Sequence, residues 1–337
     1  MKNFRNMCAL VAILAVFSPL SAWSADGNTL NIYSARHYDV DKEVYASFEK
    51  ETGIKINVVE GKGNQLLERL TREKGQSEAD LFLSVGAEIL YPLKDRGLLG
   101  EYSSKTVEKN IPQNYRGKGW MGITSRARII AYSLDRVDPS TIKTYDDLTA
   151  PRWKGKVLVR SSSSSYNVTL LASFIQLYGP EKAAQWAKGI VANFARTPKG
   201  NDRAQAKAIV AGEGDLAIMN SYYYIKMLRS SDQAEAAVPG KIGLIFPKNT
   251  HLNLSVAAMV AGAKNRDNAV KFLEYLSSEP VQRLYAEANG EFPLNPAVAL
   301  PKVQASWGSF STQKVDFENL GKFSAEAAMI FDKAGWK

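Results

Sequence analysis

The residues that offer the clearest chemistry in this chain are three consecutive tyrosines, Tyr222, Tyr223 and Tyr224. They follow the apolar run 214–219, which predicts a buried strand, and they precede residues 226–229, where a helix can begin. In open α/β sheets, ligands bind outside the carboxyl ends of the strands. Neighbouring side chains on a helix differ by roughly 100°, so we expect two rings to reach one point and the third to turn away. Tyrosines that simply close a core at a strand end remain the alternative.

Two further tyrosines stand in the same position relative to predicted strands. Tyr38 follows the predicted strand 30–34, and Tyr166 follows the predicted strand 156–160. Each precedes a helical pattern, so the three tyrosine-bearing loops predict one shared site at the strand ends. Five serines, 161–165, directly precede Tyr166. They either bind an anion through hydroxyl groups and helix-start amides or form a flexible loop.

The remaining metal-ligating residues narrow what could bind among these phenols. The chain has two histidines, His37 and His251, and one cysteine, Cys8, near its start. Zinc, copper and nickel prefer imidazole or thiolate ligands, and calcium and magnesium need an Asp-rich loop that this sequence lacks. A phenol has a pKa near 10, so only a strongly acidic cation removes its proton at neutral pH. Ferric iron fits this demand best.

Charge balance indicates which other residues belong to such a site. Three phenolates would cancel the charge of Fe3+, and a fourth would leave a negative charge that a nearby arginine could offset. Arg126 and Arg128 lie two residues apart in a predicted strand and therefore share one face. Pairing with carboxylates is the alternative for both. His37 adjoins Tyr38 and is either a further ligand or an ordinary loop residue.

The elements that must position these loops alternate along the chain. Three predicted strands alternate with three predicted helices near the start, which indicates an α/β fold with a parallel sheet and helices on both faces. The strands are 30–34, 54–59 and 79–83, and the helices are 41–52, 64–74 and 89–98. A long extended stretch, 120–134, is suited to cross between two lobes.

Four segments of the sequence together resemble a known family. They are 33–39 (Tyr-Ser-Ala-Arg-His-Tyr-Asp), 125–128 (Ser-Arg-Ala-Arg), 164–166 (Ser-Ser-Tyr) and 220–224 (Asn-Ser-Tyr-Tyr-Tyr). With them the chain resembles the periplasmic ferric-iron-binding proteins of ABC importers over essentially its whole mature length. The resemblance implies a class II periplasmic binding protein fold, with two α/β lobes joined by two crossing strands. It also implies capture of Fe3+ in the cleft and delivery to an inner-membrane ABC permease.

The resemblance also assigns roles to individual residues. Arg126 matches a basic residue near the iron, and His37 matches a position that is a ligand only in some members. Another subgroup uses a glutamate in the loop after the third strand, but here that loop, 84–87, has none and Glu88 is displaced. We therefore expect neither a carboxylate ligand nor an obligatory anion. The residues that match the ligands of the tyrosine-rich subgroup are Tyr38, Tyr166, Tyr222 and Tyr223.

The first 25 residues predict a secretory signal peptide rather than part of the fold. Lys2 and Arg5 provide a positive start, 8–20 is an apolar run, and 21–25 offers small residues for cleavage. No later stretch approaches the roughly 20 apolar residues of a spanning helix. We expect a soluble periplasmic monomer without a membrane anchor.

The basic balance of the chain does not by itself indicate nucleic-acid binding. The formal net charge is +9, and removal of the two N-terminal cations leaves the mature chain basic. No run of five or more Lys or Arg and no basic stripe broken by aromatic residues is present. A solvated basic surface therefore explains the charge, and we expect no nucleic-acid partner.

The order of predicted elements also suggests where the chain changes lobe. Pro247 and the apolar run that begins at Leu252 indicate a return to the first lobe. Two crossings would form a hinge that closes when ligand binds. The expected divisions are 28–128 plus 248–296 for the N-terminal lobe, and 129–247 plus 297–337 for the C-terminal lobe.

Two other functions remain compatible with this sequence. A binding protein of the same fold could stack an organic or phosphate-bearing solute, such as a thiamine-like compound, on these rings. An enzyme could use a tyrosine as nucleophile or acid, but no Ser-His-Asp order, GxSxG, HExxH, Walker loop or GxGxxG after a strand supports it. We therefore expect a binding protein and not an enzyme.

Overall fold

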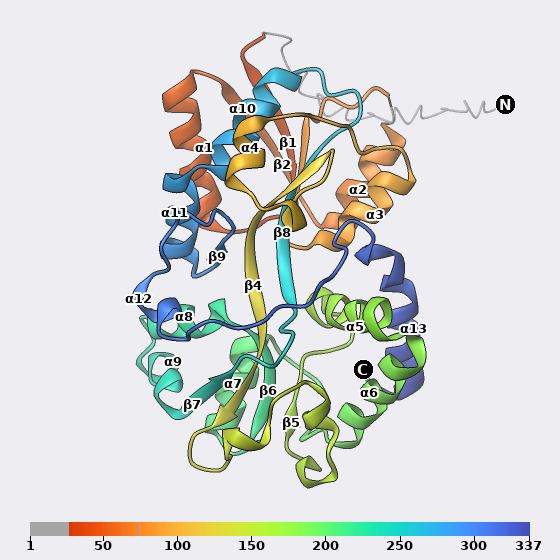
Figure 1. Cartoon of the computed structure of the whole chain (residues 1–337), viewed down its shortest axis with the longest axis vertical. Coiled ribbons are helices and arrows are strands. Elements are labelled where there is room, and N and C mark those ends of the chain that lie inside the picture. The colour runs from red at the N-terminus through yellow and green to blue at the C-terminus, as the bar shows by residue number, and fades with distance from the viewer. Residues whose placement is uncertain (1–26, 74) are drawn as a thin grey trace, which may run out of the picture.

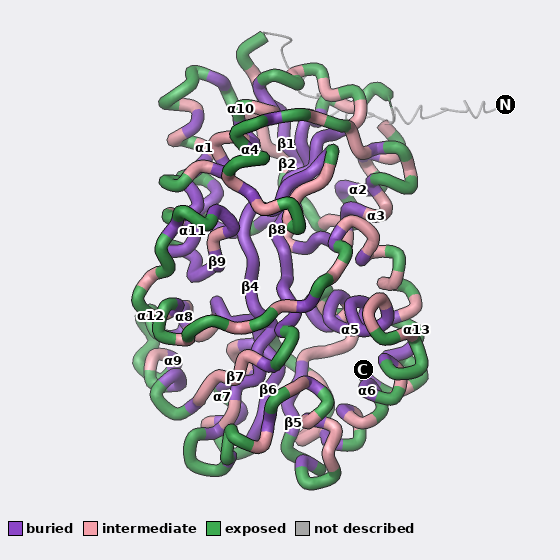
Figure 2. The backbone as a smooth tube through the Cα atoms, in the orientation of Figure 1, coloured by how far each residue is buried: buried purple, intermediate pink, exposed green. Residues whose placement is uncertain are grey.

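The computed structural model describes residues 27–73 and 75–337, so the predicted signal peptide lies outside the described residues. The molecule has an upper and a lower half in the view of Figure 1, and two long neighbouring strands run between them. These strands are β4 (Trp120–Ser133) and β8 (Leu252–Met259), which pair antiparallel. Every residue of β8 is buried, and β4 is buried except at Tyr132 (Figure 2).

The upper half is built on the three parallel strands that the sequence predicts. Their spatial order is β2–β1–β3, and β8 then joins β3 antiparallel, so the sheet as a whole is mixed. The short β9 (Phe292–Pro293) pairs with β4 at the edge. The strands are β1 (Thr29–Ser34), β2 (Lys55–Glu60) and β3 (Leu81–Ser84).

Helices cover the upper sheet because each buries one apolar stripe. In α1, Val40, Val44 and Phe48 are buried at helical spacing, and the helix ends at Gly53, whose φ of 71° requires the left-handed region that glycine adopts freely. The 3-10 turns here are η1 (Ala87–Ile89) and η2 (Gln113–Tyr115). The helices are α1 (Asp39–Thr52), α2 (Gly63–Arg72), α3 (Leu90–Asp95), α4 (Lys105–Asn110), α10 (Arg266–Ser277) and α11 (Glu279–Asn289).

The lower half forms around the second part of β4. There β6 (Leu216–Asn220) and β7 (Ile242–Ile245) both pair antiparallel with β4, and β5 (Val157–Leu158) runs parallel to β6. The helices are α5 (Ser165–Tyr178), α6 (Pro180–Ala192), α7 (Asp202–Val210), α8 (Tyr222–Leu228), α9 (Gln233–Ala236), α12 (Lys302–Ala305) and α13 (Ser324–Ala334). The 3-10 turns are η3 (Pro139–Thr141), η4 (Asp146–Thr149), η5 (Pro151–Trp153), η6 (Val238–Lys241) and η7 (Leu320–Phe323).

Two helices begin earlier than their sequence patterns indicate. Helix α5 starts at Ser165, which places Tyr166 in its first turn, and α8 starts at Tyr222 rather than near residue 226. Ser221 explains the second case: its amide donates to the Ala127 carbonyl at 2.9 Å, and its hydroxyl accepts from the Ala127 amide at 3.2 Å. The strand pairing therefore ends at Ser221 and the helix follows at once.

None of the helices in the described residues has the length and apolarity needed to span a membrane.

Candidate metal centre

Four tyrosines from separate elements converge between the two halves. Tyr38 precedes α1 in the upper half, Tyr166 lies in the first turn of α5, and Tyr222 and Tyr223 open α8. The rings of Tyr38 and Tyr222 meet edge to face with centroids 6.2 Å apart, and those of Tyr222 and Tyr223 lie 4.1 Å apart. The Tyr166 ring lies 5.8 Å from the Arg126 guanidinium, whose Nη1 also donates to the Tyr38 hydroxyl at 3.4 Å.

The third tyrosine of the triplet has a different environment. The Tyr224 hydroxyl donates to the Pro239 carbonyl at 3.4 Å, and its ring packs edge to face against Trp307 with centroids 6.0 Å apart. Neither partner belongs to the group of Tyr38, Tyr166, Tyr222 and Tyr223. The helical turn that brings Tyr222 and Tyr223 together thus directs Tyr224 elsewhere.

Burial disfavours loss of the proton from three of these tyrosines, Tyr38, Tyr222 and Tyr223. It raises the pKa of Tyr38 well above 10, and the Arg126 charge opposes this shift. Burial also raises the pKa of Tyr222 well above 10, and repulsion from phenolate charge on Tyr38 and Tyr166 adds to it. Burial likewise raises the pKa of Tyr223. A cation that removes these protons must bind oxygen strongly.

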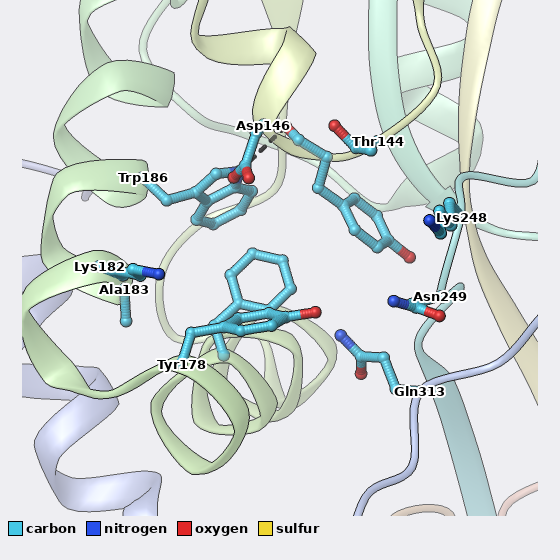
Figure 3. A pocket seen from close by; sticks show the side chains of 11 residues that line it. Thr144, Asp146, Tyr178, Lys182, Ala183, Trp186, Lys248, Asn249 and Gln313 are labelled. Carbon is cyan, nitrogen blue, oxygen red and sulfur yellow. Dashed lines mark hydrogen bonds between the residues drawn. The ribbon is translucent and has the colours of Figure 1, made fainter.

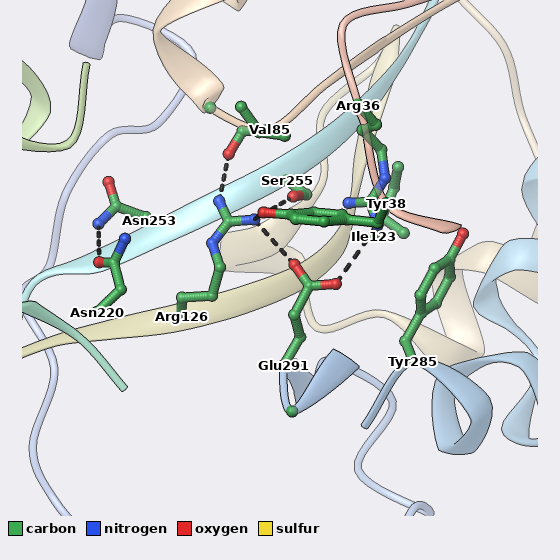
Figure 4. Close-up of polar contacts among 12 residues, drawn as sticks. Arg36, Tyr38, Val85, Ile123, Arg126, Asn220, Asn253, Ser255, Tyr285 and Glu291 are labelled. Atoms are coloured by element: carbon green, nitrogen blue, oxygen red, sulfur yellow. Dashed lines mark hydrogen bonds and ion pairs between the residues drawn. The ribbon is translucent and has the colours of Figure 1, made fainter. Parts of the chain in front are cut away.

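Arg126 is the central cation of this site. Its side chain is fully buried, and its guanidinium donates to Ser255 Oγ at 2.7 Å, to Glu291 Oε1 at 2.8 Å and to the Val85 carbonyl (Figure 4). These contacts come from β8, from the segment after α11 and from the segment after β3. The guanidinium is therefore held in one position beside the Tyr38 hydroxyl.

Glu291 connects Arg126 to a second buried arginine. Its other carboxylate oxygen lies 3.4 Å from Arg36, whose Nε donates to Asp41 at 3.0 Å. Tyr285 in turn donates to Asp41 at 2.9 Å. Burial would raise the pKa of Glu291, but Arg36 and Arg126 outweigh it, so the pKa is lowered and the carboxylate stays ionised.

A second group of charges surrounds Tyr166 from the lower half. Arg128 donates to Asp202 at 2.8 Å and to Asn167 at 2.7 Å. Arg160 lies 3.5 Å from the same Asp202 carboxylate. Both guanidiniums approach the Tyr166 ring, at 5.9 Å for Arg128 and 5.4 Å for Arg160. Arg126 and Arg128 thus share one face of β4, as the sequence predicts.

Lys226 is a neighbour of the tyrosines that the sequence pattern did not single out. It lies one helical turn after Tyr222, and its ammonium nitrogen is 5.1 Å from the ring centroids of both Tyr38 and Tyr222. Burial lowers its pKa. Its spacing of four residues from Tyr222 was the available signal. Glu291 and Asp202 gave none, because both join the site only through the tertiary fold.

His37 and Glu88 lie near this site in different surroundings. His37 is exposed, and its ring centroid is 4.9 Å from that of Tyr38. Partial burial of the ring lowers its pKa, and the charges of Arg36, Lys226 and Arg126 lower it further. Glu88 Oε2 is buried without a hydrogen-bond partner in the described part of the chain. Burial raises the pKa of this carboxyl, and Arg126 opposes the shift.

A cavity of about 580 Å³ is lined from both halves of the molecule, and Ser165 in its wall directly precedes Tyr166 in the chain. Val85, whose carbonyl accepts from Arg126, contributes to its wall. Ser163 and Ser165 line it from the lower half, so part of the serine run faces the cleft. The Ser164 hydroxyl is buried and has no hydrogen-bond partner among the described residues.

The donor set of the site is therefore phenolic. Within residues 27–73 and 75–337, no group of three or more His, Cys, Asp or Glu side chains could hold a metal ion. Five cationic side chains lie around the tyrosines, and three carboxylates pair with the arginines among them, which leaves positive charge to balance phenolates. They are Arg36, Arg126, Arg128, Arg160 and Lys226 against Asp41, Asp202 and Glu291. This arrangement suits a hard trivalent cation held by several ionised phenols.

Comparison with known families decides where the chain belongs. Residues 43–312 match the family described as bacterial extracellular solute-binding protein. The chain belongs to this family. Iron uptake protein A1 of Synechocystis sp. is 42% identical to this solute-binding protein over 326 residues, which cover 95% of this chain and 91% of that protein. The major ferric iron-binding protein of Neisseria meningitidis is 26% identical over 305 residues, or 88% of each chain.

Solved structures give the same result for the fold. A Trichodesmium protein in complex with iron and citrate ligands has a TM-score of 0.86 and 44% identity, with 92% of this chain and 100% of that chain covered. The ferric binding protein from Campylobacter jejuni has a TM-score of 0.85 and 39% identity, with 91% and 100% covered. The solute-binding protein therefore has the two-lobe periplasmic binding protein fold, which confirms the predicted fold class.

Proposed function

We propose that this solute-binding protein captures ferric iron in the periplasm through tyrosinate oxygens and delivers it to an inner-membrane ABC permease. The observation that carries the proposal is the convergence of four tyrosines from both halves around a buried arginine. The names of the relatives support it, because iron uptake and ferric iron binding recur among them. Phenolate is a hard anionic ligand, and Fe3+ is acidic enough to displace its proton.

In this proposal Tyr38, Tyr166, Tyr222 and Tyr223 are the iron ligands. Four phenolates on Fe3+ leave one excess negative charge, and Arg126 is placed to offset it because its Nη1 already contacts the Tyr38 hydroxyl. His37 is a candidate for an additional ligand, because its ring centroid lies 4.9 Å from that of Tyr38. We assign Glu88 no ligand role.

We further propose that the lobes are 28–128 plus 248–296 and 129–247 plus 297–337, so that the chain crosses between them at β4 and β8. The pairing of β4 with β8 at one end and with β6 and β7 at the other supports this division. Residues 1–25 would act as the signal peptide that exports a monomer. Catalysis forms no part of the proposed role.

Metal analysis combined with visible spectroscopy tests the function. The exported protein, loaded with Fe3+ and desalted, is expected to carry one iron per chain in native mass spectrometry and to show a visible tyrosinate-to-iron absorption band. Gallium, a colourless trivalent ion, should compete for the same site and bleach the band. A mass shift from an organic or phosphate-bearing compound, without metal and without colour, would reject the iron assignment in favour of a solute-binding role.

A further inference from the structure

A second cavity lies in the lower half, apart from the tyrosine cluster, and encloses about 300 Å³. It is bounded by the end of α5, by α6, and by the connection between β7 and β8 (Figure 3). Its volume is at the lower end of the range for small-molecule sites, which fits a ligand of about one ring. We call it the aromatic pocket, because four of its lining residues are Tyr145, Phe174, Tyr178 and Trp186.

The aromatic residues form a continuous apolar wall. Phe174 lies at its centre, with ring centroids 4.8 Å from Trp186, 5.6 Å from Tyr145 and 6.0 Å from Tyr178. Trp186, Tyr145 and Phe174 are buried, whereas Tyr178 is 47% exposed. An exposed aromatic ring at the rim of a buried aromatic cluster leaves a flat face on which a planar molecule can stack.

The wall is fixed by hydrogen bonds to the two long strands. The Tyr145 hydroxyl donates to the Arg128 carbonyl of β4 and accepts from the His251 amide, next to β8, at 3.0 Å. The Trp186 ring nitrogen donates to the Tyr145 carbonyl at 3.0 Å. The pocket is therefore preformed, which lowers the entropic cost of binding a ligand there.

Charged and amide groups at the rim define what the pocket would accept. Lys182 and Lys248 line it together with Asp146, and within the described residues none of the three forms an ion pair closer than 4.0 Å. Two cations against one carboxylate favour an anion. Figure 3 shows the Lys182 ammonium group extending toward the cavity.

Gln313 adds a buried donor with a defined direction. It is 8% exposed, and its Oε1 pairs with His251 Nδ1 at 2.8 Å. This pairing leaves the amide nitrogen free to face the cavity, and Figure 3 shows it pointing toward Tyr178. A carboxylate held between this nitrogen and Lys182 would gain a charge-assisted hydrogen bond on each side.

We propose that the aromatic pocket is a second ligand site, which binds small planar aromatic carboxylates. The ring of the ligand stacks against Tyr178 and Trp186, and its carboxylate lies between Lys182 and the Gln313 amide. The site is independent of the iron function, because none of its lining residues belongs to the tyrosine cluster.

Titration of the complete mature protein with benzoate tests this proposal. Calorimetry and saturation-transfer NMR measure the binding. We expect saturable binding at concentrations up to about 10 mM, with cyclohexanecarboxylate weaker and benzylamine not bound. The variant Lys182→Met should weaken benzoate about tenfold, which corresponds to about 1.4 kcal/mol. Lys188→Met, an exposed lysine on the same helix that does not line the pocket, is the matched control and should bind as the parent does.

Tyr178→Ala removes the exposed ring and should abolish the stacking contribution, and circular dichroism verifies that it folds. If it does not fold, Lys182→Met alone decides. Absence of saturable benzoate binding overturns the proposal, as does equal weakening by Lys182→Met and Lys188→Met. Tighter binding of benzylamine that is lost in Asp146→Asn would assign the pocket to cations and would also overturn it.

Discussion

Tyr38 and Tyr222 come from opposite halves of the molecule, and their rings meet edge to face with centroids 6.2 Å apart. Two of the proposed iron ligands therefore form part of the contact that holds the halves together. A cation bound by both tyrosine oxygens favours the arrangement in which the two halves are close together. The size of this effect is the difference between its affinities for the closed and the open arrangement. We therefore expect iron binding to favour closure of the cleft.

The tandem tyrosines give the sharpest test of the ligand assignment. Tyr223→Phe removes one anionic oxygen and keeps the ring, so we expect weaker retention of iron and a shifted visible band with unchanged folding. Tyr224→Phe is the matched control, because its hydroxyl bonds to the Pro239 carbonyl rather than facing Tyr38. Visible spectra and competition with a chelator measure both effects. If Tyr224→Phe bleaches the protein while Tyr223→Phe stays coloured, the assignment is displaced by one residue.

Iron affinity should fall as the pH falls. The pKa values of Tyr38 and Tyr222 are raised well above 10 by burial, so the iron-free phenols hold protons that Fe3+ must displace. Each proton released on binding changes the apparent affinity about tenfold per pH unit. Chelator competition at neutral and mildly acidic pH, corrected for protonation of the chelator, measures this slope. An affinity independent of pH would contradict tyrosinate ligation.

Substitution of Glu291 should destabilise the protein strongly. Glu291→Gln leaves Arg36 and Arg126 buried without their shared counter-ion, and loss of one partner of a buried pair costs about 3–5 kcal/mol. Glu279→Gln breaks an exposed pair with Arg283 and should cost less than about 1 kcal/mol. Urea unfolding of both variants compares them directly. Equal stabilities would show that the two arginines find other partners.

His251 should make the folded protein sensitive to acid. Burial lowers its pKa from 6.5 to about 4, so the unfolded chain binds a proton that the folded protein excludes. Its contribution to stability is complete above pH 6.5 and is lost as the pH falls toward 4; the loss between neutral pH and pH 5 is about 2 kcal/mol. In urea titrations at both pH values, His251→Gln should flatten this dependence. The exposed His37→Gln control should retain most of this pH dependence of stability. If His251→Gln keeps the pH dependence of the parent, His251 is not its cause.

The sequence was sufficient for the parts of the site that follow local rules. Tyr38, Tyr166 and Tyr222 each follow a strand and precede or begin a helix. Apolar runs and helical spacing in the sequence predict this placement. The alternation of β1, β2 and β3 with α1 and α2 likewise predicted parallel pairing. The early start of α8 was missed, because it depends on a hydrogen bond between Ser221 and Ala127, which are 94 residues apart.

The charges around the tyrosines could not be predicted in the same way. Glu291 reaches Arg126 across 165 residues and Arg36 across 255, and no local pattern connects them. Asp202 forms ion pairs with Arg128 and Arg160 only because α7 packs against β4 and β6. Such partners are selected by the tertiary fold, which brings a carboxylate to each buried guanidinium because an unpaired buried charge is costly.

The position of β8 in the upper sheet has a consequence for the newly made chain. This strand separates β3 from β4, yet it begins about 120 residues after β4 ends. At about 5–20 residues per second, synthesis leaves the upper sheet without its inner strand for many seconds. Such non-local pairing also folds slowly. The strand order therefore means that the upper sheet can be completed only after most of the chain has been made.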